Sequence, residues 1–222
     1  MAISAATRAV APSRMSRKKI AAVIAFVAMT VFVVLGKNQG ITNPASPVAQ
    51  HFAPAKAILI PHAIFAALAL VLGIFQFSNS LRARYARVHR SLGYVYTVAA
   101  VIGAPTGILV AVKIGPPELI LASVVQSFGW LFTLGIALYC IKTGNVAEHR
   151  RWMIRSYPFA AVFSVARLFV PLGIKLWGNP NGITPIVWTT IALAGFLPSV
   201  YLEWPKLKAR KNTNRTLAIA GD

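Results

Sequence analysis

The chain has 222 residues, of which 57% are hydrophobic and only 12% are charged. A soluble domain of this length needs far more charged surface, so the composition indicates a protein that uses a membrane as its solvent. The charge is one-sided, because 23 Lys and Arg stand against 4 acids. Most basic residues flank apolar runs, which favours anionic phospholipids as partners and excludes nucleic acid. The single cysteine, Cys140, excludes an internal disulfide and a thiolate metal site.

Six apolar runs come near the roughly 20 residues that a transmembrane helix needs. They lie at residues 20–36, 57–77, 93–112, 119–141, 156–177 and 185–204. The first run follows SRMSRKK and has no small-x-small cleavage site after it, so we predict a retained anchor helix rather than a signal peptide. An organelle transit peptide is the alternative reading of this basic N-terminus, and Met15 is an alternative start to Met1.

The pattern predicts an all-α fold, a polytopic membrane helix bundle of six transmembrane helices. Residues 57–177 would form a four-helix core, and the helices at 20–36 and 185–204 would flank it. Lys and Arg concentrate in four segments, with five in 1–19, four in 78–92, four in 142–155 and five in 205–222. Basic residues favour the cytoplasmic side. We therefore predict a multi-pass protein of the bacterial inner membrane, whose basic tails 1–19 and 205–222 are both cytoplasmic.

Two histidines are placed alike at the predicted inner boundary of the membrane. His89 and His149 lie 60 residues apart, each is followed by an arginine (Arg90 and Arg150), and each precedes an apolar run. Helices that start from the same side can bring two imidazoles together as axial ligands of a haem b, with the arginines on its propionates. The alternative is that each histidine lies in a basic loop that touches lipid phosphates.

A second set of polar residues lies in the outer half of the predicted core. His62, Gln126 and Arg167 each interrupt an apolar run, and a charge at the depth of Arg167 usually faces the bundle interior or a wet cavity. The three side chains could form one ligand-binding pocket. The alternative is hydrogen bonding between helices, which is at least as good a reading for His62 and Gln126, whereas Arg167 favours a ligand.

No motif indicates a reaction. The chain has no nucleotide-binding loop, nucleophile triad, HExxH or carboxylate dyad, so there is no positive case for a hydrolase and the catalytic residues, if any, are unknown.

Three stretches carry a resemblance to a known family. HRSLGYVY (89–96), EHRRWMIRSY (148–157) and AVFSVARLFVPL (161–172) resemble a bacterial family of predicted membrane proteins, domain of unknown function 2306, over residues 60 to 175. The resemblance supports the membrane architecture and implies no particular reaction. It draws attention to His62, His89, His149 and Arg167.

A more distant similarity is to the four-helix cores of ascorbate-reducible transmembrane cytochromes b. These cores hold two haems between histidines on alternate helices. Here His89 and His149 match one such pair, but Gln126 stands where a partner for His62 would be needed. This similarity is one of fold alone and implies at most one haem.

We therefore expect an integral inner-membrane protein that binds a small ligand or cofactor in its helix bundle. The most specific function that we expect is that of a one-haem b-type electron-transfer protein with a quinone or another redox partner. The alternatives are a transporter or lipid-binding protein that recognises an anionic group, and a structural subunit.

Overall fold

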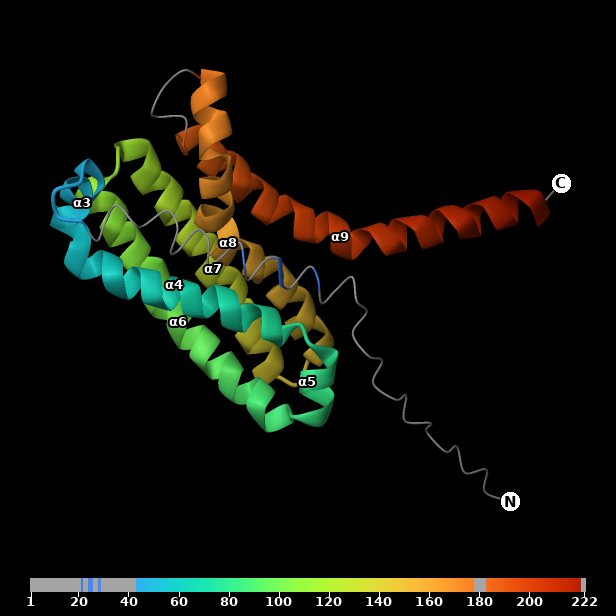
Figure 1. Cartoon of the computed structure of the whole chain (residues 1–222). Coiled ribbons are helices and arrows are strands. Elements are labelled where there is room, and N and C mark those ends of the chain that lie inside the picture. Colours follow the sequence, from blue (N-terminus) through green and yellow to red (C-terminus); the bar gives the residue numbers. More distant parts are fainter. Residues whose placement is uncertain (1–20, 22–23, 26–27, 29–42, 178–182, 221–222) are drawn as a thin grey trace.

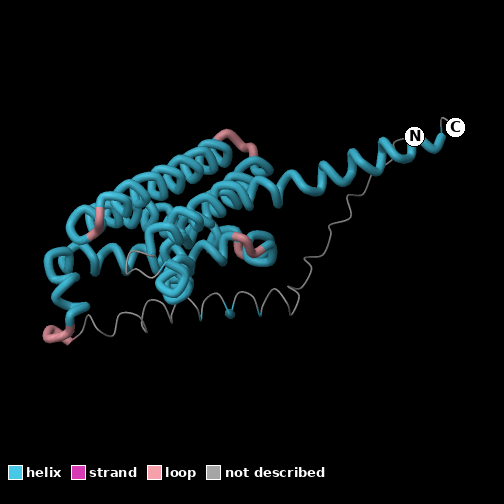
Figure 2. The backbone as a smooth tube through the Cα atoms, turned by 90° about the horizontal axis from the view of Figure 1, so that it is seen from above, coloured by secondary structure: helices cyan, strands magenta, loops and turns pink. Residues whose placement is uncertain are grey.

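The computed structural model describes residues 43–177 and 183–220, together with residues 21, 24, 25 and 28. Within these residues all regular structure is helical, which confirms the all-α prediction (Figures 1 and 2). The elements are α3 (Pro47–Phe52), η2 (Ala53–Ala55), α4 (Lys56–Gln76), α5 (Asn79–Arg84), α6 (Ala86–Ile114), α7 (Pro117–Lys142), α8 (Val146–Trp177) and α9 (Ile183–Ala220). The predicted anchor helix at 20–36 lies almost entirely outside the described residues.

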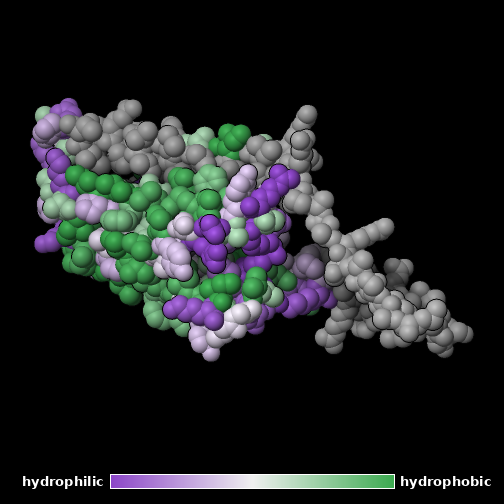
Figure 3. All heavy atoms as spheres, turned by 90° about the horizontal axis from the view of Figure 1, so that it is seen from below, coloured by the Kyte–Doolittle hydropathy of each residue, from purple (hydrophilic) through white to green (hydrophobic). Residues whose placement is uncertain are grey.

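Five of the described helical stretches are long and apolar enough to cross a membrane. They are Ala49–Gln76, Ala86–Ile114, Pro117–Lys142, Val146–Leu176 and Ile183–Leu207. Each of these stretches contains nearly all of one predicted apolar run, in order the runs at 57–77, 93–112, 119–141, 156–177 and 185–204. Hydrophilic surface gathers toward the two ends of the bundle and a broad hydrophobic band lies between them (Figure 3), as expected for a multi-pass membrane protein.

Two helices begin earlier than their apolar runs predict. α6 begins at Ala86 and α8 at Val146, whereas the apolar runs begin at 93 and 156. At the start of α8, Gly144 adopts a φ of 79° and the Asn145 side chain accepts a hydrogen bond from the backbone N–H of Glu148 at 3.1 Å. This capping lets a helix form through a basic stretch that hydropathy alone assigns to a loop.

The last helix also differs in length from the prediction. The apolar run predicts an end near residue 204, but α9 continues through Pro205 to Ala220, and its last turns extend away from the bundle (Figure 1). The basic segment after 204 is therefore a helical continuation of the last span.

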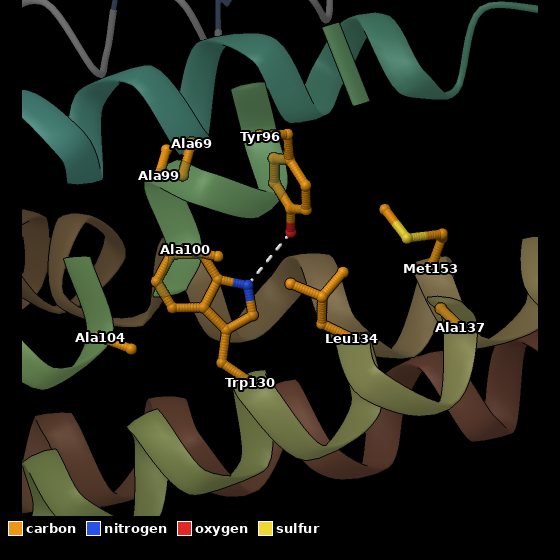
Figure 4. Packing of buried hydrophobic residues seen from close by; sticks show 9 residues of the cluster. All are labelled: Ala69, Tyr96, Ala99, Ala100, Ala104, Trp130, Leu134, Ala137 and Met153. Atoms are coloured by element: carbon orange, nitrogen blue, oxygen red, sulfur yellow. Dashed lines mark hydrogen bonds between the residues drawn. The ribbon is translucent and has the colours of Figure 1, made fainter. Parts of the chain in front are cut away.

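Small residues set the spacing of the helices. α4 packs along α6, α7 along α8, α6 beside α7, and α8 along α9. Between α4, α6, α7 and α8 lies a first buried cluster built on five alanines (Ala69, Ala99, Ala100, Ala104 and Ala137) around Trp130. Such residues let helix backbones approach closely where no hydrophobic effect drives association. Trp130 Nε1 donates a hydrogen bond to the Tyr96 hydroxyl at 3.1 Å inside this cluster (Figure 4).

A second buried cluster joins α9 to the other helices. Its buried members are Ala122 of α7, Val162 and Ala166 of α8, and Ile186, Val187, Ile191 and Ala194 of α9. One face of α8 therefore packs against α9 and another against the core that α4, α6 and α7 form.

Tyr157 of α8 is wedged against α4 where Gly73 leaves room for it. A Cβ atom at Gly73 would lie 2.2 Å from Tyr157 Cε2 and 2.5 Å from its Cδ2. The ring is held in place from its far end, because the Tyr157 hydroxyl donates to the Leu70 carbonyl at 2.7 Å. Phe77 adds an edge-to-face contact with the same ring at a centroid distance of 5.4 Å. The absence of a side chain at Gly73 thus determines how closely α4 and α8 approach.

We expect Gly73→Ala to destabilise the protein by about 1–3 kcal/mol, the usual cost of overpacking, because the Tyr157 ring cannot move without losing its hydrogen bond. Thermal unfolding of the purified protein in detergent measures the change. Gly135→Ala is the matched control, since a Cβ there meets no atom within 4 Å. It should leave the stability unchanged or raise it by up to about 1 kcal/mol through helix propensity. Equal unfolding temperatures for Gly73→Ala and the wild type would contradict the wedge.

Candidate functional site

A cavity of about 500 Å³ opens at the end of the bundle that carries the basic segments 78–92 and 142–155, which we call the basic end. Residues of α4, α5, α6, α7 and α8 line it, together with Phe77. Its polar lining residues include Gln76, Arg82, His89, Arg90, Thr97, His149 and Arg150. Its apolar wall includes Tyr96, Leu134, Leu138 and Met153. Four residues predicted to bind a haem, namely the two histidines with their following arginines, therefore meet at one cavity.

The imidazole of His149 is fixed by a hydrogen bond across the α7–α8 hairpin. Its Nδ1 lies 2.8 Å from the backbone carbonyl oxygen of Ala137, and since a carbonyl only accepts, this nitrogen carries the proton. The Nε2 atom is left for another partner. A histidine that ligates a metal commonly has its second nitrogen held in this way, which fixes both the tautomer and the ring orientation.

Two buried polar atoms in the cavity wall have no hydrogen-bond partner among the described residues. They are His89 Nδ1 and Gln76 Nε2. The Gln76 side chain lies where Gly93 of α6 leaves space, because a Cβ at Gly93 would come within 3.3 Å of Gln76 Oε1. Buried polar atoms are nearly always paired, so these two atoms are available to hydrogen-bond a water or a ligand in the cavity.

Three arginines give the cavity a strong positive charge. Arg90 and Arg150 are exposed at its rim, and Arg82 of α5 is half-buried beside them. Burial and the nearby Arg150 guanidinium lower the pKa of Arg82, so these two cations lie within repulsive range of each other. No Asp or Glu is among the residues that line the cavity. Like charges gathered without an acid favour an anionic ligand.

The acids near the basic end pair with other arginines. Glu203 of α9 forms ion pairs with Arg151, with Arg155 at 3.9 Å and with Lys206 at 2.8 Å. Glu148 lies 3.6 Å from Arg151, which fits a surface ion pair rather than a partner of His149. Arg151 and Arg155 are thus neutralised on the α9 side of α8, whereas the described residues leave the cavity arginines without an acid.

Two of the three residues predicted to form an outer pocket form hydrogen bonds to neighbouring helices. His62 of α4 donates from Nδ1 to the Gly103 carbonyl of α6 at 2.9 Å, and it lies against Gly107, where a Cβ would come within 2.9 Å of its ring. Gln126 of α7 donates from Nε2 to the Phe159 carbonyl of α8 at 2.7 Å. Each of these two side chains joins a pair of helices, as the alternative of interhelical hydrogen bonding requires.

Arg167 differs from His62 and Gln126, because no hydrogen bond or ion pair is found for it within the described part of the chain. None of the three predicted pocket residues lines the basic-end cavity. Nor do they line a second, smaller cavity of about 250 Å³ between α8 and α9. The walls of that second cavity are apolar apart from Thr189 and Thr190, whose hydroxyls donate to their own helix.

Sequence reasoning missed part of the site. Gln76 and Arg82 line the cavity because the chain turns sharply between α4 and α6, where Ser78 caps the short helix α5 by accepting from the Leu81 N–H at 3.2 Å. A serine three residues before Leu81 in a polar stretch is the signal that could have revealed this helix. Tyr96 and Met153 were missed because apolar runs do not show which of their residues face a cavity.

Comparison with known proteins identifies a family and no characterised relative. A family described as "Predicted membrane protein (DUF2306)" matches residues 59–205, which is more than half of the chain and extends beyond the predicted 60–175 into α9. The chain therefore belongs to this family. Neither the curated proteins nor the solved structures contain a significant match.

We expect Gln126→Leu to destabilise the protein by about 0.6–1.7 kcal/mol, the range measured for hydrogen bonds between transmembrane helices. The reason is the loss of its bond to the Phe159 carbonyl. Thermal unfolding in detergent tests this, and Gln50→Leu on exposed α3 is the control for the same change in side chain. If Gln126 served only to contact a ligand, the ligand-free variant would unfold at the wild-type temperature.

Proposed function

We propose that this member of the DUF2306 family is a one-haem b-type electron-transfer protein of the bacterial inner membrane. In this proposal the basic end faces the cytoplasm, and the cavity there holds haem b between His89 and His149. The observation that carries the proposal is that one cavity contains both histidines together with Arg82, Arg90 and Arg150. A quinone in the bilayer is the redox partner that an apolar bundle can reach most directly.

The residues that line the basic-end cavity fit a haem b. A volume of about 500 Å³ falls in the range of roughly 300–1,000 Å³ that cofactor sites occupy. The fixed Nδ1 of His149 leaves Nε2 available as a ligand, and His89 lies within electrostatic reach of His149. Haem b would supply one-electron transfer at its iron.

Different residues of the cavity would contact the apolar and the charged parts of the haem. Tyr96, Leu134 and Met153 provide an apolar wall that excludes water. Arg90 and Arg150 at the rim can each pair with a carboxylate, and a guanidinium does so through two parallel hydrogen bonds. The positive charge of the site also favours the uptake of an anionic molecule from the cytoplasmic side.

A second candidate function is binding or transport of another amphipathic anion, such as a lipid with an acidic headgroup. The unpaired Gln76 Nε2 and His89 Nδ1 favour it, because a haem ligated by histidine Nε2 atoms leaves the Nδ1 of His89 without a partner. An acidic headgroup could accept hydrogen bonds from both nitrogens while the arginines neutralise its charge.

Absorption spectroscopy distinguishes these candidates. The protein, purified from cells supplied with haem precursor, should show a Soret band and the sharp α-band of reduced low-spin haem. His89→Ala and His149→Ala should each abolish the low-spin spectrum, because six-coordinate iron needs both imidazoles. His62→Ala is the control and should retain it, since His62 lies outside the cavity.

A colourless wild-type protein would rule out the haem proposal. The second candidate then requires an acidic lipid that co-purifies, detectable by native mass spectrometry. Replacing both Arg82 and Arg150 with glutamine should reduce its occupancy at least tenfold. Retention of a low-spin spectrum in His89→Ala would equally exclude the assigned ligand pair.

The proposed orientation is tested separately by reporter fusions. Fusions after residues 45, 116 and 181 should be active only for a periplasmic reporter, whereas a fusion after residue 222 should be active only for a cytoplasmic one, because the basic residues concentrate on the inner side. The control is a fusion after residue 144, which should match the one after 222. A periplasmic signal from residue 222 would overturn the orientation.

A further inference from the structure

Arg167 lies on the face of α8 that points into the bundle. It follows Ala160 by seven residues and Ser164 by three, and residues at such spacing share one helical face. Ala160 packs against the first buried cluster, and Ser164 is only 6% exposed. α9 instead packs against Val162 and Ala166, on another face of the same helix. The Arg167 side chain is therefore directed toward α4, α6 and α7 rather than toward α9.

The directions of the helices bring Arg167 toward His62. α8 runs away from the basic end and α4 runs toward it, and Tyr157 of α8 contacts Leu70 and Gly73 of α4. Because the two helices rise equally per residue in opposite directions, ten residues further along α8 and about ten residues back along α4 bring Arg167 and His62 to the same level of the bundle. Consistently, Arg167 lies within electrostatic reach of His62. His62 is itself fixed, by its bond to the Gly103 carbonyl and by its position against Gly107.

No acceptor for the Arg167 guanidinium is found in the part of the chain that the structure describes. The ion pairs found there use Glu148 and Glu203, both at the basic end. Glu118, at the opposite end, is exposed at the start of α7. An uncompensated guanidinium at the centre of a membrane helix costs about 2.5–3.5 kcal/mol on insertion scales. A group that carries one negative charge would remove this cost by pairing with the five N–H donors of the guanidinium.

We propose that Arg167 holds a small monovalent anion, a halide or a small carboxylate, inside the half of the bundle opposite the basic end and next to His62. One unpaired guanidinium balances one negative charge, which favours a monovalent anion over phosphate. The anion is small because Arg167 lines neither of the two cavities described above, and Ala122 of α7, which packs in one cluster with the adjacent Ala166, is fully buried. The site is separate from the basic-end cavity and does not depend on what that cavity binds.

The test measures how anions stabilise the purified protein in detergent, with gluconate as the reference anion at constant ionic strength. Added chloride or acetate should raise the unfolding temperature of the wild type to a saturating value, because an anion that binds only the folded state stabilises it by mass action. Radioactive chloride in equilibrium dialysis gives the stoichiometry, expected to be one. Saturation by chloride assigns a halide, and saturation by acetate alone assigns a carboxylate.

Arg167→Leu should abolish the saturable response or weaken it at least tenfold. Lys175→Leu is the matched control, because it removes one charge from an exposed position of the same helix, and it should respond like the wild type. Arg167→Lys keeps the charge but loses the planar fork, so it should bind the anion more weakly than the wild type. It replaces Arg167→Leu as the test variant if the leucine variant does not fold. The proposal is overturned by a wild type without a saturable response to either anion, by an unchanged response in Arg167→Leu or Arg167→Lys, or by an equal loss in Lys175→Leu.

Discussion

The close approach of α4 and α8 at Gly73 and Tyr157 is the contact on which the basic end of the bundle depends. Gln76 and Phe77, at the end of α4, are lining residues of the cavity, and they lie within one turn of Gly73. Histidine and arginine residues from α6 and α8 form the facing walls. Because Tyr157 is held both by the space at Gly73 and by the Leu70 carbonyl, it sets the separation of these walls. The polar chemistry of the cavity thus rests on a contact between a glycine and an aromatic ring.

Charge is divided between the two sides of α8. Arg151 and Arg155 are compensated by Glu203 of α9, while Arg150, on the other side, lines the cavity with Arg82 and Arg90. Of the four acids in the sequence, Glu148 and Glu203 lie near Arg151 and Glu118 is exposed at the start of α7, so none of these three neutralises the cavity arginines. The same scarcity leaves Arg167 without an acidic partner among the residues that the structure describes. The uncompensated arginines therefore identify both places where a ligand can contribute the missing charge.

Hydropathy was sufficient to predict the membrane class and the five described spans, because burying about 20 apolar residues in lipid outweighs most local preferences. It was also sufficient to place His89 and His149 at one end, since both precede apolar runs that start from the same side. It failed at helix starts, because α6 and α8 include basic stretches that hydropathy assigns to loops, in α8 directly after the Asn145 cap. It could not distinguish Gln126 and His62, which bond to neighbouring helices, from Arg167. Which carbonyl a polar side chain can reach depends on helix rotation, and a single sequence does not specify that rotation.

The tight connection between α7 and α8 has a consequence for how the length of this protein can vary. Gly144 in its positive-φ conformation and the capping residue Asn145 fix where α8 begins, and each residue of a helix turns by about 100° around its axis. One residue more or fewer at this connection would change the angular phase of all of α8. His149 would turn away from the Ala137 carbonyl, and Arg151 would turn away from Glu203 at the same time. Insertions and deletions in this hairpin are therefore poorly tolerated, because its length keeps the His149–Ala137 and Arg151–Glu203 contacts of one helix in phase.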